Sequence, residues 1–152
     1  MFHKALILLH LVGFAAYLGA GFAQQQFMMR SARGGLASAV RDEYERLAAS
    51  ILTSIELPAI FLQVVSGSLI VLMVPIWMNQ GWLHAKLACV ALLLVLSHLE
   101  MFNARKIVKA RVARGDAAAD EIAARKNRHA LFGLVGTLAL VAVVVLVALG
   151  TG

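Results

Sequence analysis

Residues 81–106 read GWLHAKLACVALLLVLSHLEMFNARK, and this stretch decides the fold class of the chain. Within its core, residues 83–99, the strongly polar side chains are His84, Lys86, Ser97 and His98. At about 1.5 Å per residue, a helix of this length crosses a hydrocarbon layer of roughly 30 Å. The stretch therefore predicts a membrane-spanning helix.

Further apolar runs of similar length lie at residues 5–23, 51–76 and 130–149. The chain has 152 residues, of which 61% are hydrophobic, so little remains for a domain outside the membrane. We predict an all-α fold, a single transmembrane four-helix bundle over residues 1–152. Its helices are expected at about 5–33, 42–77, 82–112 and 129–150.

The basic residues predict how the chain is oriented. Twelve of the fourteen Lys and Arg residues lie in segments 24–50 and 105–128. Because cytoplasmic loops carry such an excess, we place these segments in the cytoplasm. Both termini and the turn at 77–82 then lie on the outer, periplasmic side of a bacterial inner membrane. The net charge of +6 is thus a topology signal, and we expect membrane lipid rather than nucleic acid as a partner.

Two local features bear on the processing of the chain. Lys4 and the apolar run that follows are typical of a signal peptide, but we expect a retained first helix. Cys89, the only cysteine, lies in the middle of an apolar run. The sequence therefore excludes an internal disulfide and the Cys-x-x-Cys-His motif that attaches haem covalently.

Histidines within or beside the apolar runs are the predicted metal ligands: His10, His84, His98 and His129. His84 and His98 are fourteen positions apart, so their rings project from nearly the same helix face, roughly 21 Å apart. Imidazole is costly to bury in lipid unless something binds it. Because haem iron binds one imidazole on each side of the porphyrin, a ligand pair must come from facing helices at similar depth.

Depth along the apolar runs selects the ligand pairs. His10 with His84 and His98 with His129 are nearest in level, each about 7 to 8 Å apart before helix tilt. These pairs predict one or two haems. Gly13, one turn after His10, would let the macrocycle lie against the backbone, and close helix packing is the alternative interpretation.

Further residues are expected around the cofactor. Gly133 and Gly136 lie in the opening turns of the fourth helix and are predicted cofactor contacts. Lys86 and Arg105 would neutralise haem propionates, although Lys86 at the outer surface also suits a side chain that reaches up to the interface. Glu56, near the start of the second apolar run, is predicted to handle protons, and a structural hydrogen bond is the alternative.

The first three helices resemble a known family. His10, the block Gly81–Leu87, the run Ala91–Leu94 before His98, and the basic stretch after Phe102 are similar to the HemJ-type protoporphyrinogen oxidases. CopD-like membrane proteins, associated with copper resistance, have the same general four-helix pattern. The resemblance implies that His10 binds haem b and that the reaction oxidises protoporphyrinogen. This chain reads KNRHA at 126–130, where the family carries Asn-Glu-Pro.

The sequence thus predicts a haem b-binding membrane redox protein that transfers electrons through histidine-ligated haem. Porphyrinogen or a quinone would be the redox partner, and whether the protein is an enzyme stays open. A CopD-like copper-handling protein, using His3, His10 and methionines, is one alternative. A non-catalytic subunit of a larger membrane complex is another. Glycine-bearing helix faces also allow a homodimer.

Overall fold

The computed structural model describes residues 2–150, and the chain is all-α over that range. The elements, in order, are α1 (Phe2–Ser31), α2 (Ser38–Ile51), the π-helical η1 (Leu52–Glu56), α3 (Leu57–Met73), the 3₁₀-helical η2 (Pro75–Asn79), α4 (Gly81–Arg114), the 3₁₀-helical η3 (Gly115–Ala118) and α5 (Ala119–Gly150).

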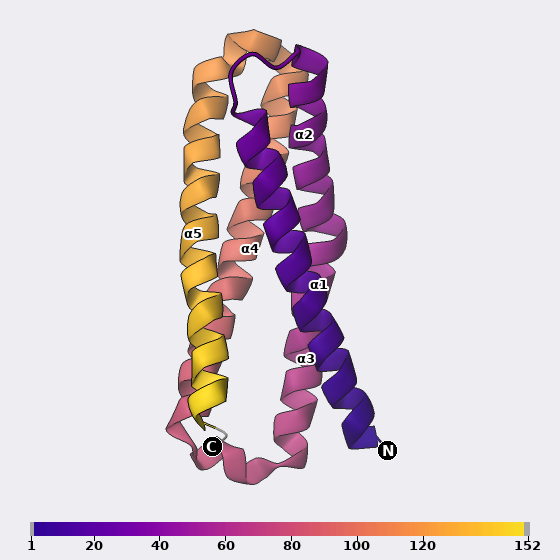
Figure 1. The fold of residues 1–152 in the computed structure, drawn as a ribbon, viewed down its shortest axis with the longest axis vertical. Coiled ribbons are helices and arrows are strands. Elements are labelled where there is room, and N and C mark those ends of the chain that lie inside the picture. The colour runs from indigo at the N-terminus through magenta and orange to yellow at the C-terminus, as the bar shows by residue number, and fades with distance from the viewer. Residues whose placement is uncertain (1, 151–152) are drawn as a thin grey trace.

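The helices form an elongated bundle in which α2, η1 and α3 continue one another (Figure 1). α1 packs on α2 and α3, while α5 packs on α4. Both ends of the described chain lie at the same end of the bundle as η2, and we call this the η2 end (Figure 1). η3 and the link at 32–37 lie at the opposite end, the η3 end.

Three helical stretches within residues 2–150 are long and apolar enough to span a membrane: Phe2–Ser31, Ser38–Met73 and Gly81–Gly150. In their most apolar windows only 11 to 33% of the residues are buried inside the molecule. Most apolar side chains therefore face outward, as suits a lipid solvent and not water. The prediction of an all-α membrane protein is confirmed.

Some predicted helix limits are wrong. α5 begins at Ala119 and not near 129, because residues 117–124, AAADEIAA, are mostly strong helix formers. Asp120 and Glu121 also place negative charge in its first turn, where the helix dipole favours it. α3 ends at Met73 and not near 77, because Val74 precedes Pro75 and is held out of the helical conformation, at φ −131° and ψ 70°.

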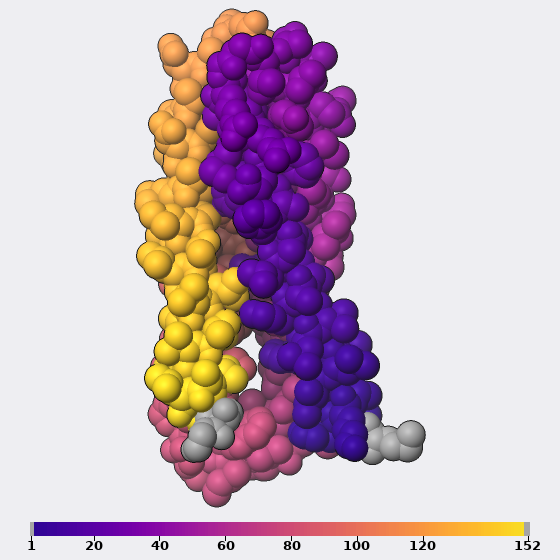
Figure 2. Space-filling view, in the orientation of Figure 1, coloured from indigo at the N-terminus to yellow at the C-terminus, as the bar shows by residue number. Residues whose placement is uncertain are grey.

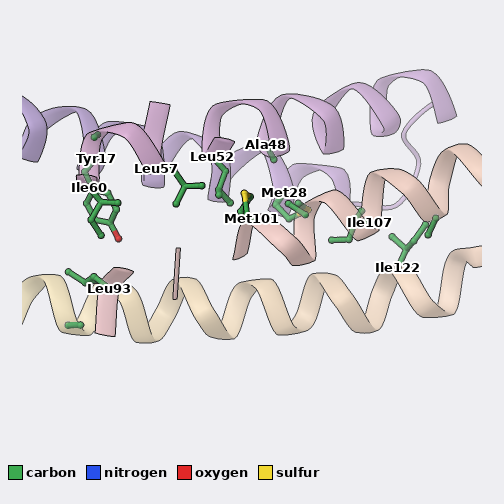
Figure 3. Close-up of a cluster of buried hydrophobic side chains, with 14 of the residues drawn as sticks. Tyr17, Met28, Ala48, Leu52, Leu57, Ile60, Leu93, Met101, Ile107 and Ile122 are labelled. Atoms are coloured by element: carbon green, nitrogen blue, oxygen red, sulfur yellow. The ribbon is translucent and has the colours of Figure 1, made fainter. Parts of the chain in front are cut away.

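The buried apolar cluster lies towards the η3 end of the bundle. Met28, Leu52, Met101 and Ile107 are among its members, and Figure 3 shows them between the facing helices. Towards the η2 end the pair α1/α3 separates from the pair α4/α5 (Figure 1). Figure 2 shows an opening there, bordered by α1 and α5. The two helix pairs are thus held together mainly in the half of the bundle nearer η3.

Candidate functional site

Five polar side chains are buried where the helix pairs meet. They come from α1, η1, α4 and α5, and each is at most 5% exposed: Gln24, Glu56, Ser97, Glu100 and His129. Buried polar groups in a membrane protein are costly and usually mark function. We call these five residues, together with their partners Tyr17 and Gln25, the interior polar chain.

One half of the interior polar chain ends on Glu56. The Ser97 hydroxyl donates a 3.0 Å hydrogen bond to Glu56 Oε1. The Tyr17 hydroxyl lies 3.1 Å from Ser97 Oγ, and because the Ser97 proton points to Glu56, Tyr17 is the donor. Glu56 Oε2 is buried and has no hydrogen-bond partner. That oxygen is therefore open to a proton or another ligand.

The other half is built on Glu100. Gln25 Nε2 donates a 2.7 Å bond to Glu100 Oε1, and Gln24 Nε2 lies 3.5 Å from Glu100 Oε2. The oxygen of the Gln24 amide accepts a 2.7 Å bond from His129 Nε2. Since that nitrogen carries the proton, Nδ1 of neutral His129 has a free lone pair, and it is buried without a partner.

The two carboxyl groups are near each other and have no cation. Glu56 bonds to Ser97, and Glu100 follows Ser97 by three residues on α4, so both carboxyls lie within one helical turn of that helix. Within residues 2–150, neither forms an ion pair with a basic side chain. A buried carboxylate without a cation is costly. The site is therefore arranged to hold protons or a positive ion.

Local sequence explains how Glu56 reaches the interior. It is the last residue of the π-helical turn η1, two positions before Pro58. Proline has no N–H to donate along the helix, and π turns relieve such interruptions and recur at functional sites. Gly21 faces the same carboxyl, because a Cβ there would lie 3.8 Å from Glu56 Oε2.

Three of the predicted ligands share one hydrogen-bond pattern. Nδ1 lies 3.1 Å from Gln63 O in His10, 3.1 Å from Gln80 O in His84 and 2.8 Å from Leu94 O in His98. A carbonyl oxygen only accepts, so Nδ1 carries the proton and Nε2 keeps its lone pair. Metal-binding histidines are oriented in this way.

The predicted histidine pairs share no hydrogen-bond partner. His10 Nδ1 also lies 3.1 Å from Ser66 Oγ on α3. The rings of His98 and Phe61 pack edge to face. His84 is exposed and bonds within its own helix. His129 belongs to the interior polar chain instead. Among residues 2–150 there is no group of three or more His, Cys, Asp or Glu side chains arranged for a metal ion.

The remaining predicted contacts lie in different places. A Cβ on Gly13 would meet Gln63 Cγ at 3.0 Å, so this glycine lets α1 approach α3 closely. A Cβ on Gly133 would overlap the Gln25 amide, so Gly133 makes room for the interior polar chain. Lys86 is close enough to His10 for a charge interaction. Gly136 faces Leu93, and Arg105 borders a groove at the η3 end.

A charged cluster, not predicted from the sequence, closes the bundle beyond the apolar runs. Glu45 is 1% exposed and pairs with Arg111 at 3.0 Å and Lys126 at 2.7 Å. Arg111 also reaches Asp42 at 3.2 Å and Asp116 at 3.3 Å. Hydrogen bonds to Glu45 raise the pKa of Arg111, whereas burial lowers the pKa of Lys126. The cluster ties α2 to α4, η3 and α5.

Sequence reasoning selected Glu56 and His129 but missed the rest of the interior polar chain. Ser97 and Glu100 had a visible signal, since each is a polar residue at or near the end of an apolar run. Gln24 and Gln25 had none, because they begin a long polar segment. Their burial depends on α1 continuing as a helix to Ser31.

Comparison with known proteins supplies the family. No curated protein and no solved structure matches the chain. Nothing found in this comparison links the chain to the HemJ-type oxidases or to the CopD-like proteins. A family described as "Predicted integral membrane protein (DUF2269)" matches residues 4–150. Because this match spans nearly the whole sequence, the chain belongs to the DUF2269 family of integral membrane proteins.

Proposed function

We propose that this protein binds and releases protons inside the membrane, with Glu56 and Glu100 as the exchanging groups. The observation that carries the proposal is the burial of two neighbouring carboxyl groups without a cation within the described residues. Intramembrane carboxyls of this kind form the proton relays of pumps and transporters. One proton held by one carboxyl removes the repulsion between the two.

The neighbouring side chains have distinct parts in this scheme. Ser97 holds Glu56 by a hydrogen bond and Tyr17 in turn bonds to Ser97, so the two hydroxyls can pass a proton by reversing their direction. Gln25 holds Glu100. Gln24 keeps the imidazole of His129 in place, and Nδ1 of that ring is buried without a partner. The groups that carry or pass protons therefore lie on α1, η1 and α4.

The proposal includes four membrane crossings in a bacterial inner membrane. α4 and α5 lie side by side and run in opposite directions, so the stretch Gly81–Gly150 makes two of them (Figure 1). Basic residues gather at the η3 end, as on the cytoplasmic side of membrane proteins. Both termini are then on the outer side.

Electron transfer through haem b is a second candidate function, and the free Nε2 atoms of three histidines favour it. His10 would hold the iron together with His84 or His98, and Lys86 would neutralise a propionate. Haem supplies one-electron chemistry. Glu56 and Glu100 would take up the accompanying protons from a porphyrinogen or quinone. His129 is left out of this scheme, because its ring is fully buried and belongs to the interior polar chain.

Infrared spectroscopy of the protein in bilayers tests the proton proposal. We expect a protonated-carboxyl C=O band that titrates with pH and that Glu56→Gln or Glu100→Gln removes or shifts. Glu43→Gln, which alters an exposed acid on α2, is the matched control and should leave the band unchanged. Two carboxyls that remain ionised at every pH in the folded protein would refute the proposal.

A reduced-minus-oxidised absorption spectrum tests the haem candidate separately. Haem bands should be present in purified protein, and His10→Ala should abolish them or remove one component. Full haem content in His10→Ala would exclude His10 as a ligand. Stoichiometric copper without haem bands would favour the CopD-like alternative, and stable copurifying proteins without either would favour a subunit of a larger complex.

A further inference from the structure

A groove runs between α2 and α4 at the η3 end, separate from the interior polar chain. Its volume is about 440 Å³. Its lining includes the apolar residues Ala49, Val108 and Val112, which we call the floor. It also includes the basic residues Arg46, Arg105 and Lys109, which we call the rim. The groove thus combines an apolar surface with three positive charges.

The rim carries positive charge that the protein does not neutralise. Within residues 2–150, Arg105 and Lys109 form no ion pair with an acidic side chain. Arg46 pairs with Glu43 only at 3.7 Å, and both side chains are more than half exposed. The nearby Arg111 is different, because Glu45, Asp42 and Asp116 surround it. The rim therefore has charge available for an anion.

The groove lies at the depth of lipid headgroups. Arg105 follows Phe102, the last large apolar residue before the basic stretch of α4, by three residues, and Ala49 precedes the apolar run at 51–76 by two. At about 1.5 Å per residue, both positions are within roughly 5 Å of the apolar boundary. Arg105 and Lys109 are one helical turn apart, so they face the same side of α4.

We propose that this groove binds an anionic phospholipid of the leaflet at the η3 end. The phosphate contacts the guanidinium of Arg105 and the ammonium of Lys109, with Arg46 across the groove. The glycerol lies against Ala49 and Val108, the apolar groove residues nearest the apolar runs. Basic pockets between membrane helices suit such headgroups, and the apolar floor favours a lipid over free phosphate. The site is independent of the proton proposal.

Lipid titration of the purified full-length protein tests the site. The probes are phosphatidylglycerol and phosphatidylcholine of the same acyl composition, with bound lipid measured by native mass spectrometry. Phosphatidylglycerol should bind in preference. The double substitution Arg105→Gln/Lys109→Gln should weaken phosphatidylglycerol binding about 25-fold, taking each basic residue as worth roughly a factor of five. Both side chains lack ion-pair partners, so the fold should be retained, as thermal unfolding by circular dichroism checks.

Matched controls separate this site from general attraction by a basic surface. Arg30→Gln/Arg33→Gln removes the same charge at the same end and should change binding less than twofold. Val108→Asn changes a partly exposed groove residue between Arg105 and Lys109, and it should weaken phosphatidylglycerol binding without affecting inorganic phosphate. Three results would overturn the proposal. The two double variants could lose phosphatidylglycerol binding equally, phosphatidylcholine could bind as tightly as phosphatidylglycerol, or inorganic phosphate could compete as well as the lipid does.

Discussion

At the scale of single residues, the interior polar chain depends on the absence of a side chain as much as on the polar groups. Gly133 leaves the space that the Gln25 amide occupies beside Glu100. Gly21 leaves the space beside Glu56 Oε2. Glycine in a membrane helix thus allows a polar side chain of a neighbouring helix to approach the backbone.

Gly133→Ala should therefore destabilise the bundle. The new Cβ would overlap the Gln25 amide, so that amide must move away from its position on Glu100. Gly19→Ala is the matched control, because nothing lies within 4 Å of its Cβ position and both variants gain the same helix propensity. We expect the free energy of unfolding of Gly133→Ala to be about 1–3 kcal/mol below that of the control in detergent denaturation. Equal stabilities would mean that Gln25 does not hold Glu100.

At the scale of the elements, two polar layers join the helices. The interior polar chain joins α1, η1, α4 and α5 between the apolar stretches of these helices. The charged cluster joins α2, α4, η3 and α5 beyond the apolar runs. Lys126 Nζ also donates a 2.9 Å bond to Ser31 O, which brings the carboxyl end of α1 into the cluster.

Glu45→Gln should loosen the helix ends at the η3 end. The substitution leaves Arg111 and Lys126 buried without their main counter-charge, which typically costs about 3–5 kcal/mol. Glu43→Gln on the same helix removes only an exposed pair and should cost less than about 1 kcal/mol. Hydrogen exchange of α2 and the start of α5 measures the loosening. Similar exchange in both variants would show that the cluster does not hold these ends.

At the scale of the whole molecule, the proposed orientation has a direct test. In a Cys89→Ser background, Met78→Cys in η2 and Ala117→Cys in η3 introduce exposed thiols at opposite ends of the bundle. A maleimide that does not cross the inner membrane should label Met78→Cys in intact spheroplasts and Ala117→Cys only after permeabilisation. The reverse pattern would place the termini in the cytoplasm.

The sequence by itself determined that the chain is all-α and integral to a membrane, and that its basic residues gather at one end. These properties are local, since a run of apolar residues forms a helix in lipid whatever its neighbours are. Element limits were less certain: residues 119–128 carry charges and were expected outside the fourth helix, yet strong helix formers extend α5 through them.

Only the tertiary structure decided which polar residues meet. Glu56 with Ser97, Glu100 with Gln25, and His129 with Gln24 come from helices that are apolar on nearly every side within the membrane. Such helices have no amphipathic stripe to show which face turns inward. Rotation about the helix axis and relative depth therefore follow from packing, from glycine positions and from the π turn before Pro58. For that reason the sequence did not reveal that His129 bonds to Gln24.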